Sequence, residues 1–460
     1  MGTLMMMGIS AALGLSGGLL CLLSWRVRFA AWVALIPLAA AVWLATPAAA
    51  AVAGLLFGGT AAIGQLWGRV PFNRRFERIT IAITAVSFAA TTALAAWAWP
   101  DGTPAWGLAV FPASMLLVTG VAERQAGRLA NGVLAMAQRY RTLVHVARLG
   151  HDQAVTALLA LWSVLPVALL ANWPPAPVTI AVVSTAAAAV AAGLAFGRFS
   201  LGTTSRAAEA APRIRVAAVA VDLDTAGPPG QEARGRLAQV IGAYDPLLSR
   251  AFAQGARVVV LPENAAWASA DGDRTEWLGT LARWARQGQA TVVAGMFDEL
   301  AGRNQAVVAG PDGRLLASYD KRHPFGAGES FTRGTEPAAA ITEPLRLAAA
   351  ICYDLDFNDL VRPARRHGGI LAAPTNDWAE YAAIHRQAAI WVPVCTGTTL
   401  VRAASHGISA IIDPAGRTLA EASSFDGPVV LVADAPLTPG RSPATAATRA
   451  AGAGRPAVPA

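Results

Sequence analysis

The sequence has almost no lysine. Lys321 is the only one, and arginine supplies the rest of the 37 basic residues. A guanidinium is a planar, permanently charged fork, whereas an ammonium is a compact point charge that fits a tight pocket. The single lysine lies in the segment 318-SYDKRHPFGAGES-330. It either survived by chance in an arginine-rich composition or stands at a site where only an ammonium works.

Cysteine and histidine are scarce as well, and this excludes two classes of site. Three cysteines give no disulfide framework. We expect Cys21 to be packed within lipid and Cys395 to lie in a core, and we expect Cys352 and Cys395 to be free thiols. The six histidines show no metal-ligand spacing, so we expect no zinc or iron site.

Charged residues make up only 14% of the chain, compared with roughly 25% in soluble domains. The mean hydropathy is +0.43, so we expect a large part of the chain to lie in lipid. The whole net charge of +8 resides in residues 1–212, which hold 13 arginines and 5 acidic residues. Because these arginines stand between apolar segments, we expect anionic lipid headgroups as partners and no nucleic acid.

Long apolar runs fill the first 200 residues, and a bilayer span needs about 17–25 such residues. We predict seven transmembrane helices, at about 4–24, 29–46, 48–67, 79–99, 104–122, 154–172 and 176–197. The polar segment 123–153 is either an amphipathic arm on the membrane or an ordinary loop with one interfacial helix. The loop arginines all fall on one side. The positive-inside rule places that side, and the chain after residue 200, in the cytoplasm.

From about residue 213 the sequence alternates between apolar strands and helices. Strands are predicted at 214–222, 257–263, 291–297, 305–310, 314–320, 346–354, 369–377, 407–413 and 428–434, and helices at 231–254, 275–288, 356–367 and 379–395. Hairpin turns are predicted at 311–313 and 414–416. The pattern indicates an α/β domain with helices layered over sheet. We therefore divide the chain into a membrane domain at 1–200, an α/β domain at 213–437 and a disordered tail at 438–460.

Three residues with reactive side chains end or border these strands. Glu263 closes 258-VVVLPE-263, at the rim of the sheet where sites in α/β domains form. Lys321 follows the strand at 314–320. Cys352 lies just before a predicted helix, whose N-terminus would stabilise a thiolate. Each also has a plain structural explanation, as a helix cap, a surface residue and a small buried hydrophobe respectively.

Taken together, the order Glu263, Lys321, Cys352 at strand ends resembles the nitrilase (carbon–nitrogen hydrolase) superfamily. The segments that carry this resemblance are 261-LPE-263, 319-YDKRH-323, 351-ICYD-354 and 375-TNDW-378. The resemblance implies an α-β-β-α sandwich with these three residues as a catalytic triad, and a second essential glutamate at Glu329. With seven preceding spans, residues 8–436 resemble the apolipoprotein N-acyltransferase family of the bacterial cytoplasmic membrane.

The second resemblance implies a reaction. Glu263 takes the thiol proton and then returns it to the leaving group. Cys352 accepts an acyl chain from a phospholipid as a thioester, and the N-terminal amine of a lipoprotein receives that chain. Lys321 and a backbone N–H near Tyr353 stabilise the oxyanion, Glu329 orients Lys321 or the amine, and no metal or cofactor takes part. The family's catalytic domain faces the periplasm or cell exterior. This conflicts with the basic loops, and we favour the family's orientation.

The sequence departs from the acyltransferase pattern in three places. Residues 438–460 cannot form the family's eighth span, only 22 residues separate Glu329 from Cys352, and Asp354 stands where a glutamate is expected. Two alternatives stay open. One is a membrane-tethered amidase or nitrilase-type hydrolase, which would use the same triad. The other is a membrane scaffold with a degenerate nitrilase-like domain, against which the intact triad argues.

Overall fold

The computed structural model describes residues 2–24, 26–27, 29–67, 74–99, 104–126, 140–223, 233–325, 329–335, 340–341, 345–357, 364 and 369–439. These residues form two compact units, with the boundary between Thr203 and Thr204. Most of the predicted tail, most of the predicted helix at 356–367 and part of the segment 123–153 lie outside the described residues.

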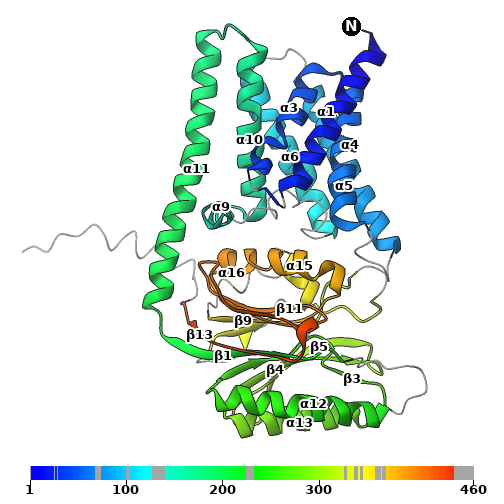
Figure 1. Ribbon diagram of the computed structural model, residues 1–460, viewed down its shortest axis with the longest axis vertical. Coiled ribbons are helices and arrows are strands. Elements are labelled where there is room, and N and C mark those ends of the chain that lie inside the picture. The colour runs from blue at the N-terminus through cyan, green and yellow to red at the C-terminus, as the bar shows by residue number, and fades with distance from the viewer. Residues whose placement is uncertain are drawn as a thin grey trace, which may run out of the picture. The chain divides into compact units, whose positions relative to one another are not determined.

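The described part of the first unit is built of helices. They are α1 (Thr3–Ser24), α2 (Ala30–Val33), α3 (Ile36–Leu44), α4 (Pro47–Leu66), α5 (Arg74–Trp97), α6 (Pro104–Ala126), α9 (Arg141–Val146), α10 (His151–Ala171) and α11 (Pro177–Ala210) (Figure 1). Among the described residues α1, α4, α5, α10 and α11 are long and apolar enough to cross a membrane. These are five of the seven predicted spans. The other two are helical but shorter, at 30–44 and 106–121.

Two segments of this unit differ from the prediction. α11 continues beyond the predicted end at residue 197 because no proline interrupts it before Pro212 and 206-RAAEAA-211 is rich in helix formers. The described part of the predicted arm at 123–153 contains the short helix α9, whose residues 143–146 are all buried. Its His145 lies 3.1 Å from Ser200 of α11.

Small residues bring α1, α4 and α5 close together. A Cβ atom at Gly14 of α1 would touch the backbone oxygen of Ala53 on α4, and one at Gly54 of α4 would touch the backbone oxygen of Phe88 on α5. Thr92 of α5 donates a hydrogen bond of 2.8 Å to a backbone oxygen of α4. Close backbone approach and interhelical hydrogen bonds of this kind hold helices together in lipid, where burial of apolar surface gives no net gain.

The second unit contains two sheets. The first has the order β13-β1-β2-β4-β5-β6, with β3 beside β4, and the second the order β12-β11-β10-β9-β8-β7. The strands of the first are β1 (Arg213–Ala220), β2 (Val258–Val260), β3 (Ala266–Ala268), β4 (Thr291–Asp298), β5 (Arg303–Ala309), β6 (Leu315–Asp320) and β13 (Val429–Pro436). Those of the second are β7 (Ala340–Ile341), β8 (Leu347–Ala349), β9 (Ile370–Asn376), β10 (Thr399–Ser405), β11 (Ile408–Ile412) and β12 (Thr418–Ser423).

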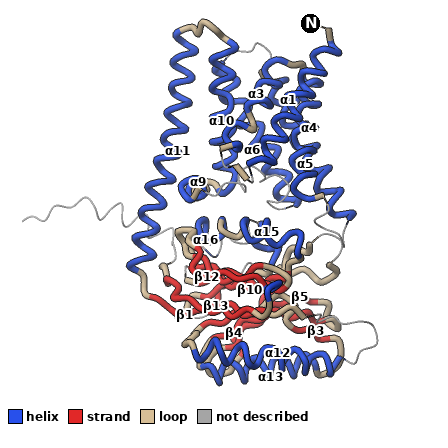
Figure 2. Tube along the Cα trace, in the orientation of Figure 1, coloured by secondary structure: helices blue, strands red, loops and turns tan. Residues whose placement is uncertain are grey.

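Helices cover the outer face of each sheet. α12 (Ala233–Ala253) and α13 (Asp273–Gly288) lie against the first sheet, and α15 (Ala379–Ala388) and α16 (Trp391–Thr396) against the second (Figures 1 and 2). The short 3₁₀ helices η2 (Cys352–Asp356) and η3 (Ser424–Asp426) lie in connections. The unit is thus an α-β-β-α sandwich, and the predicted fold class is confirmed.

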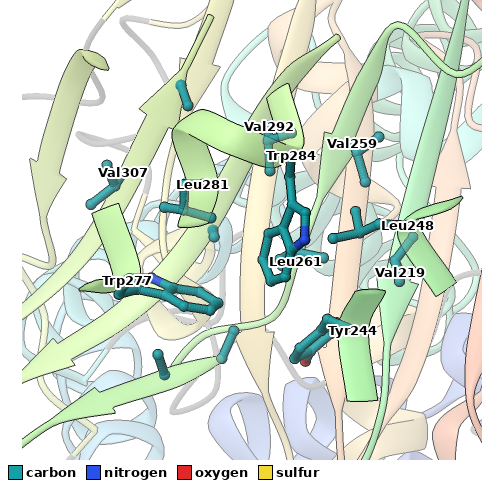
Figure 3. Packing of buried hydrophobic residues seen from close by; sticks show 14 of the residues in the cluster. Val219, Tyr244, Leu248, Val259, Leu261, Trp277, Leu281, Trp284, Val292 and Val307 are labelled. Atoms are coloured by element: carbon teal, nitrogen blue, oxygen red, sulfur yellow. The ribbon is translucent and has the colours of Figure 1, made fainter. Parts of the chain in front are cut away.

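Strands buried on both faces explain the continuous apolar runs in the sequence. On β1, Val216 points into the core between the sheets, whereas Ala217 points into the core under α12 and α13. Trp277 and Trp284 of α13 fill this second core and meet edge to face at 5.5 Å (Figure 3). The first sheet therefore separates two hydrophobic cores and is buried on both faces.

All nine predicted strands are present, and four further strands were not predicted: β3, β7, β10 and β12. Both predicted hairpin turns are confirmed, with Gly313 and Gly416 in the left-handed conformation that the turns require. The predicted strand at 346–354 is shorter than expected. It ends at Ala349 because the chain turns sharply into η2 at Cys352.

Candidate active site

Glu263 follows β2 and is buried between the two sheets. Its Oε1 accepts hydrogen bonds from Lys321 Nζ at 2.7 Å and Asn304 Nδ2 at 2.8 Å, and its Oε2 accepts one from the backbone N–H of Asn376 at 3.2 Å. Its own N–H donates to the Thr375 oxygen across the sheets at 3.3 Å. Burial raises the pKa of Glu263 above its ordinary value, although the Lys321 ammonium acts in the opposite direction.

The backbone at Glu263 passes directly against β4. A Cβ atom at Gly295 would touch the Pro262 oxygen and lie 2.5 Å from the Glu263 Cα. The Gly295 N–H also donates to the Pro262 oxygen at 3.0 Å. Glycine is needed here because no side chain fits between β4 and the segment that carries the carboxylate.

Lys321 follows β6 and has no exposed surface. Its ammonium donates to Glu263 at 2.7 Å and to both oxygens of Glu329 at 2.9 and 2.8 Å. Glu329 in turn accepts from the Phe325 N–H at 2.8 Å. Burial alone would lower the pKa of Lys321, but the two carboxylates outweigh it and raise that pKa well above its ordinary value. Lys321 therefore stays charged, which excludes the surface explanation for this residue.

Cys352 begins η2 with a φ of 48°, in the left-handed region that a non-glycine residue adopts at a cost of about 1–3 kcal/mol. The residue is 6% exposed, and its thiol donates to the Asn376 oxygen at 3.6 Å. Burial raises the pKa of Cys352 well above its ordinary value, the Glu263 carboxylate adds to this, and Lys321 opposes it. The expectation of a thiolate stabilised by a helix N-terminus is therefore wrong: desolvation dominates, and the resting thiol needs a base.

The backbone of Asn376, the last residue of β9, contacts both the Glu263 carboxylate and the Cys352 thiol. Its N–H donates to Glu263, and its C=O accepts from Cys352. Its side-chain Oδ1 accepts from Ser405 Oγ at 3.0 Å and lies 3.1 Å from His406 Nδ1. This anchoring holds the Asn376 peptide at a fixed position between Glu263 and Cys352.

Asp354 joins the turn that carries Cys352 to the loop that carries Lys321. It is fully buried and accepts from Tyr319 Oη at 2.8 Å, from the Ile351 N–H at 3.3 Å and from the His323 N–H at 2.9 Å. Asp354 stands where a glutamate was expected, and both oxygens of its shorter side chain accept hydrogen bonds.

The neighbouring Tyr353 side chain is buried. Its ring packs edge-on against Phe325 and Phe357 at 5.0 and 5.1 Å. These contacts form an aromatic wall next to Cys352.

A second charged cluster lies beside the thiol. Single ligand atoms of Cys352, Asp377 and His385 all lie within 4.8 Å of one another, a spacing that would suit a metal ion. However, Arg402 Nη2 lies 2.5 Å from Asp377 Oδ2 and 3.1 Å from His385 Nδ1. The guanidinium already neutralises the carboxylate, so this donor set does not suit a further cation and we assign no metal ligands here.

The structure brings Glu263, Lys321, Cys352 and Glu329 into one site and places Asp354 directly behind it. Sequence reasoning missed Asn304 and the part played by Asn376. The segment 375-TNDW-378 had been noted, but nothing local indicated that the Asn376 backbone would contact both reactive groups. Asn304 gave only a weak signal, as an amide directly before the predicted strand at 305–310, and the structure shows that it is buried.

Known proteins match the second unit. The family model for carbon–nitrogen hydrolases matches residues 206–439. A deaminated glutathione amidase of Synechocystis sp. is 28% identical over 232 residues, which are 42% of this chain and 85% of the relative. An apolipoprotein N-acyltransferase of Bradyrhizobium diazoefficiens is 34% identical over 143 residues, 25% of this chain and 27% of the relative.

Among solved structures, an amidase of the nitrilase superfamily from Nesterenkonia sp. AN1 matches with a TM-score of 0.42 and 22% identity. The match covers 49% of this chain and 93% of the amidase. Because the family model spans half of the sequence, including every residue of the site, the chain belongs to the carbon–nitrogen hydrolase family, the nitrilase superfamily.

Proposed function

We propose that this protein is a membrane-bound acyltransferase that moves a fatty acyl chain from a phospholipid, through a thioester on Cys352, to the N-terminal amine of a lipoprotein. The observation that carries the proposal is the combination of two features in one chain. Glu263, Lys321 and Cys352 share a buried site, and the described residues of the other unit include five helices long and apolar enough to span a bilayer. The similarity to an N-acyltransferase over 143 residues supports the same conclusion.

Acylation begins with removal of the thiol proton. The raised pKa of Cys352 favours its protonated form, and the nearby Glu263, whose own pKa is also raised, is the acceptor for that proton. The thiolate then attacks the ester carbonyl of the acyl donor and forms the thioester. The left-handed backbone at Cys352 places this residue in a sharp turn at the start of η2.

Lys321 is the proposed electrostatic partner of the oxyanion. Its charge is held in place by Glu263 and Glu329, so it is available without reorganisation when negative charge develops on the substrate oxygen. A donor of this type is worth roughly 3–4 kcal/mol of barrier. We assign the backbone N–H near Tyr353 as a second donor, and Glu329 as the residue that orients Lys321.

An amidase is the second candidate, and one observation favours it. The match to the deaminated glutathione amidase covers 85% of that relative, far more than the match to the acyltransferase covers. The same residues would serve both reactions, since the thioester can be resolved by water or by an amine. The acyl donor and acceptor therefore distinguish the two, whereas the residues of the site do not.

The test starts with the full chain in nanodiscs of phosphatidylethanolamine and phosphatidylglycerol. Intact mass spectrometry should detect one added acyl chain, removed by neutral hydroxylamine. Cys352→Ala should abolish the adduct, and Cys395→Ala, which changes a core thiol, should retain it. Undiminished acylation of Cys352→Ala would refute the assignment of the nucleophile.

The second stage supplies two diacylated cysteinyl peptides, one with a free and one with an acetylated N-terminus. Transfer of the acyl chain to the free amine alone supports N-acyltransfer. If phospholipid gives no adduct while small amides are hydrolysed in a Cys352-dependent manner, the amidase is correct. Mass spectrometry of lipoprotein N-termini from cells with and without the gene extends the test to natural acceptors.

A further inference from the structure

Asn304 of β5 contacts two residues of the triad at once. Its side-chain Nδ2 donates to Glu263 Oε1 at 2.8 Å, and its backbone oxygen accepts from the Lys321 N–H at 2.8 Å. The residue is 2% exposed. Its side chain lies on the face of β5 that carries Ala306 and Val308 into the core between the sheets. None of the steps proposed above uses Asn304.

The amide of Asn304 is bonded at one end only. Its nitrogen faces Glu263, because Lys321 donates to the same carboxylate oxygen, which therefore acts as an acceptor. Within the described part of the chain, Asn304 Oδ1 is buried and has no hydrogen-bond partner. A buried acceptor without a partner destabilises a fold, and an apolar side chain of similar size would avoid that cost. Packing alone therefore does not explain an amide at this position.

Two carboxylates share one ammonium at this site. Lys321 has three N–H groups, and it makes one hydrogen bond to Glu263 and two to Glu329. The Glu329 side chain is 29% exposed, so water can solvate part of its charge, whereas the Glu263 side chain is 1% exposed. The charge of Glu263 therefore depends also on neutral donors, which are the Asn304 amide and the Asn376 backbone N–H.

The environment of Glu263 contains several other titratable groups. They are Lys321 and Glu329 after β6, Cys352 of η2, and Tyr244 of α12 and His406 after β10, which line a small cavity together with Glu263. Burial raises the pKa of Glu263 most, Lys321 lowers it and Glu329 raises it, while the hydrogen bond from Asn304 lowers it. Asn304 thus stabilises the Glu263 anion without adding a charge to the site.

We propose that Asn304 is a positioning residue of this site, whose amide holds Glu263 as an oriented carboxylate that can take the proton of the Cys352 thiol. The proposal rests on the proposed function in that Cys352 is acylated and Glu263 is its base. Asn304 acts through Glu263 and gives up no proton. In the step that it supports, the S–H bond of Cys352 breaks and an O–H bond forms on Glu263, while the amide keeps its own hydrogens.

The test follows the acylation of Cys352 as a function of pH. The full chain in detergent is mixed with the p-nitrophenyl ester of octanoic acid, and a single turnover is timed by mass spectrometry of the Cys352 adduct. Nitrophenolate leaves without a proton, so the rate depends on removal of the thiol proton. Because Glu263 must be ionised to accept that proton, the rate should rise with pH through the pKa of Glu263, and this rise is the acid limb of the profile.

Asn304→Leu keeps a side chain of similar size and removes the donor. Loss of a hydrogen bond that stabilises the anion raises the pKa of Glu263, so the acid limb should move to higher pH. On that limb we expect acylation to be about tenfold slower than in the wild type, with a smaller loss on the plateau at higher pH. Gln305→Leu is the matched control, because Gln305 is also 2% exposed but its amide bonds to Asp320 and Arg274. It should leave the midpoint of the acid limb unchanged.

An acid limb that stays in place in Asn304→Leu, or an equal loss of rate at every pH, would assign Asn304 a purely structural role and overturn the proposal. A shift of the same size in Gln305→Leu would do so as well. If Asn304→Leu does not fold, Asn304→Val decides the question, because it removes the same donor with a side chain that suits a strand. Cys352→Ala should not be acylated; persistent acylation in it would refute the proposed function, whatever the Asn304 variants show.

Discussion

Lys321 shows why a chain that otherwise uses arginine retains one lysine. Its ammonium lies in a fully enclosed space and contacts three carboxylate oxygens within 2.9 Å. A guanidinium is larger and planar and cannot point one charge at three converging acceptors. These contacts argue against the alternative that Lys321 survived by chance in an arginine-rich composition. The role of its shape can be tested with a substitution that keeps the positive charge.

We predict that Lys321→Arg lowers the rate of Cys352 acylation by roughly 10²-fold or more, because the charge moves away from the oxyanion. Single-turnover acylation from phospholipid measures this. Arg314→Lys, an exchange in the opposite direction on an exposed turn, is the matched control and should leave the rate unchanged. Turnover like that of the wild type in Lys321→Arg would mean that the ammonium is dispensable.

A second prediction concerns the pH at which Cys352 becomes a thiolate. Iodoacetamide reacts with the thiolate, so its rate rises with pH through the pKa of the thiol. Burial and Glu263 raise that pKa, and Lys321 lowers it. Glu263→Gln should therefore move the midpoint of alkylation to lower pH, and Lys321→Met should move it to higher pH. The measurement needs a background in which Cys21 and Cys395 are alanine. Shifts of the same sign in both variants would contradict this electrostatic account.

At this scale the sequence reveals residues that lie in short recognisable segments and hides those that act through distant contacts. Glu263, Lys321, Cys352 and Glu329 all lie in such segments. In contrast, Asn304 contacts Glu263 from 41 positions away, and Asn376 contacts it from 113 positions away. An asparagine has no local signature for such a role, because only the sheet pairing brings it to the carboxylate.

At the scale of elements, β10 shows the same difficulty. The strand 399-TLVRAAS-405 was not predicted because Arg402 at its centre interrupts an apolar pattern. Its charge is accommodated in the interior because Asp377, 25 positions earlier, pairs with it. Strands without internal charge, such as β9 and β11, were predicted correctly. A strand whose buried charge is paired with a residue from another element therefore cannot be recognised from local hydropathy alone.

The contact between β4 and the Glu263 segment gives an element-scale prediction. Gly295→Ala places a methyl group against the backbone of Pro262 and Glu263, so the carboxylate must move. We expect a loss of about 1–3 kcal/mol in the free energy of unfolding, together with slower acylation. Chemical denaturation and the acylation assay measure the two effects.

Gly279→Ala provides the comparison for Gly295→Ala. Gly279 lies on α13, and no atom lies within 4 Å of an added Cβ there. This change should leave activity intact and stabilise the helix by about 0.5–1 kcal/mol. Equal behaviour of the two variants would show that close approach at Gly295 is not what positions Glu263.

At the scale of the whole molecule, the side of the membrane that the second unit faces is a prediction still to be tested. The basic loops favour the cytoplasm, whereas the proposed acceptor is an exported lipoprotein that is available only outside. We expect the exterior. Alkaline phosphatase fused after Leu437 should then be active, and green fluorescent protein fused there and exported by the general secretion route should be dark. The opposite pattern would exclude lipoprotein N-acylation and leave an intracellular amidase or another lipid-linked acyl transfer.

The pairing of β13 with β1 also determines when the second unit can fold. All eight residues of β1 pair with β13, from Arg213 opposite Pro436 to Ala220 opposite Val429. These two neighbouring strands therefore come from opposite ends of the second unit's sequence. The ribosome delivers β1 some two hundred residues before its partner exists, and the nascent unit must wait with an open edge until the last strand emerges. The pairing of β1 with its last partner is therefore completed late, so the final step in closing the first sheet brings together two strands that are far apart in the sequence.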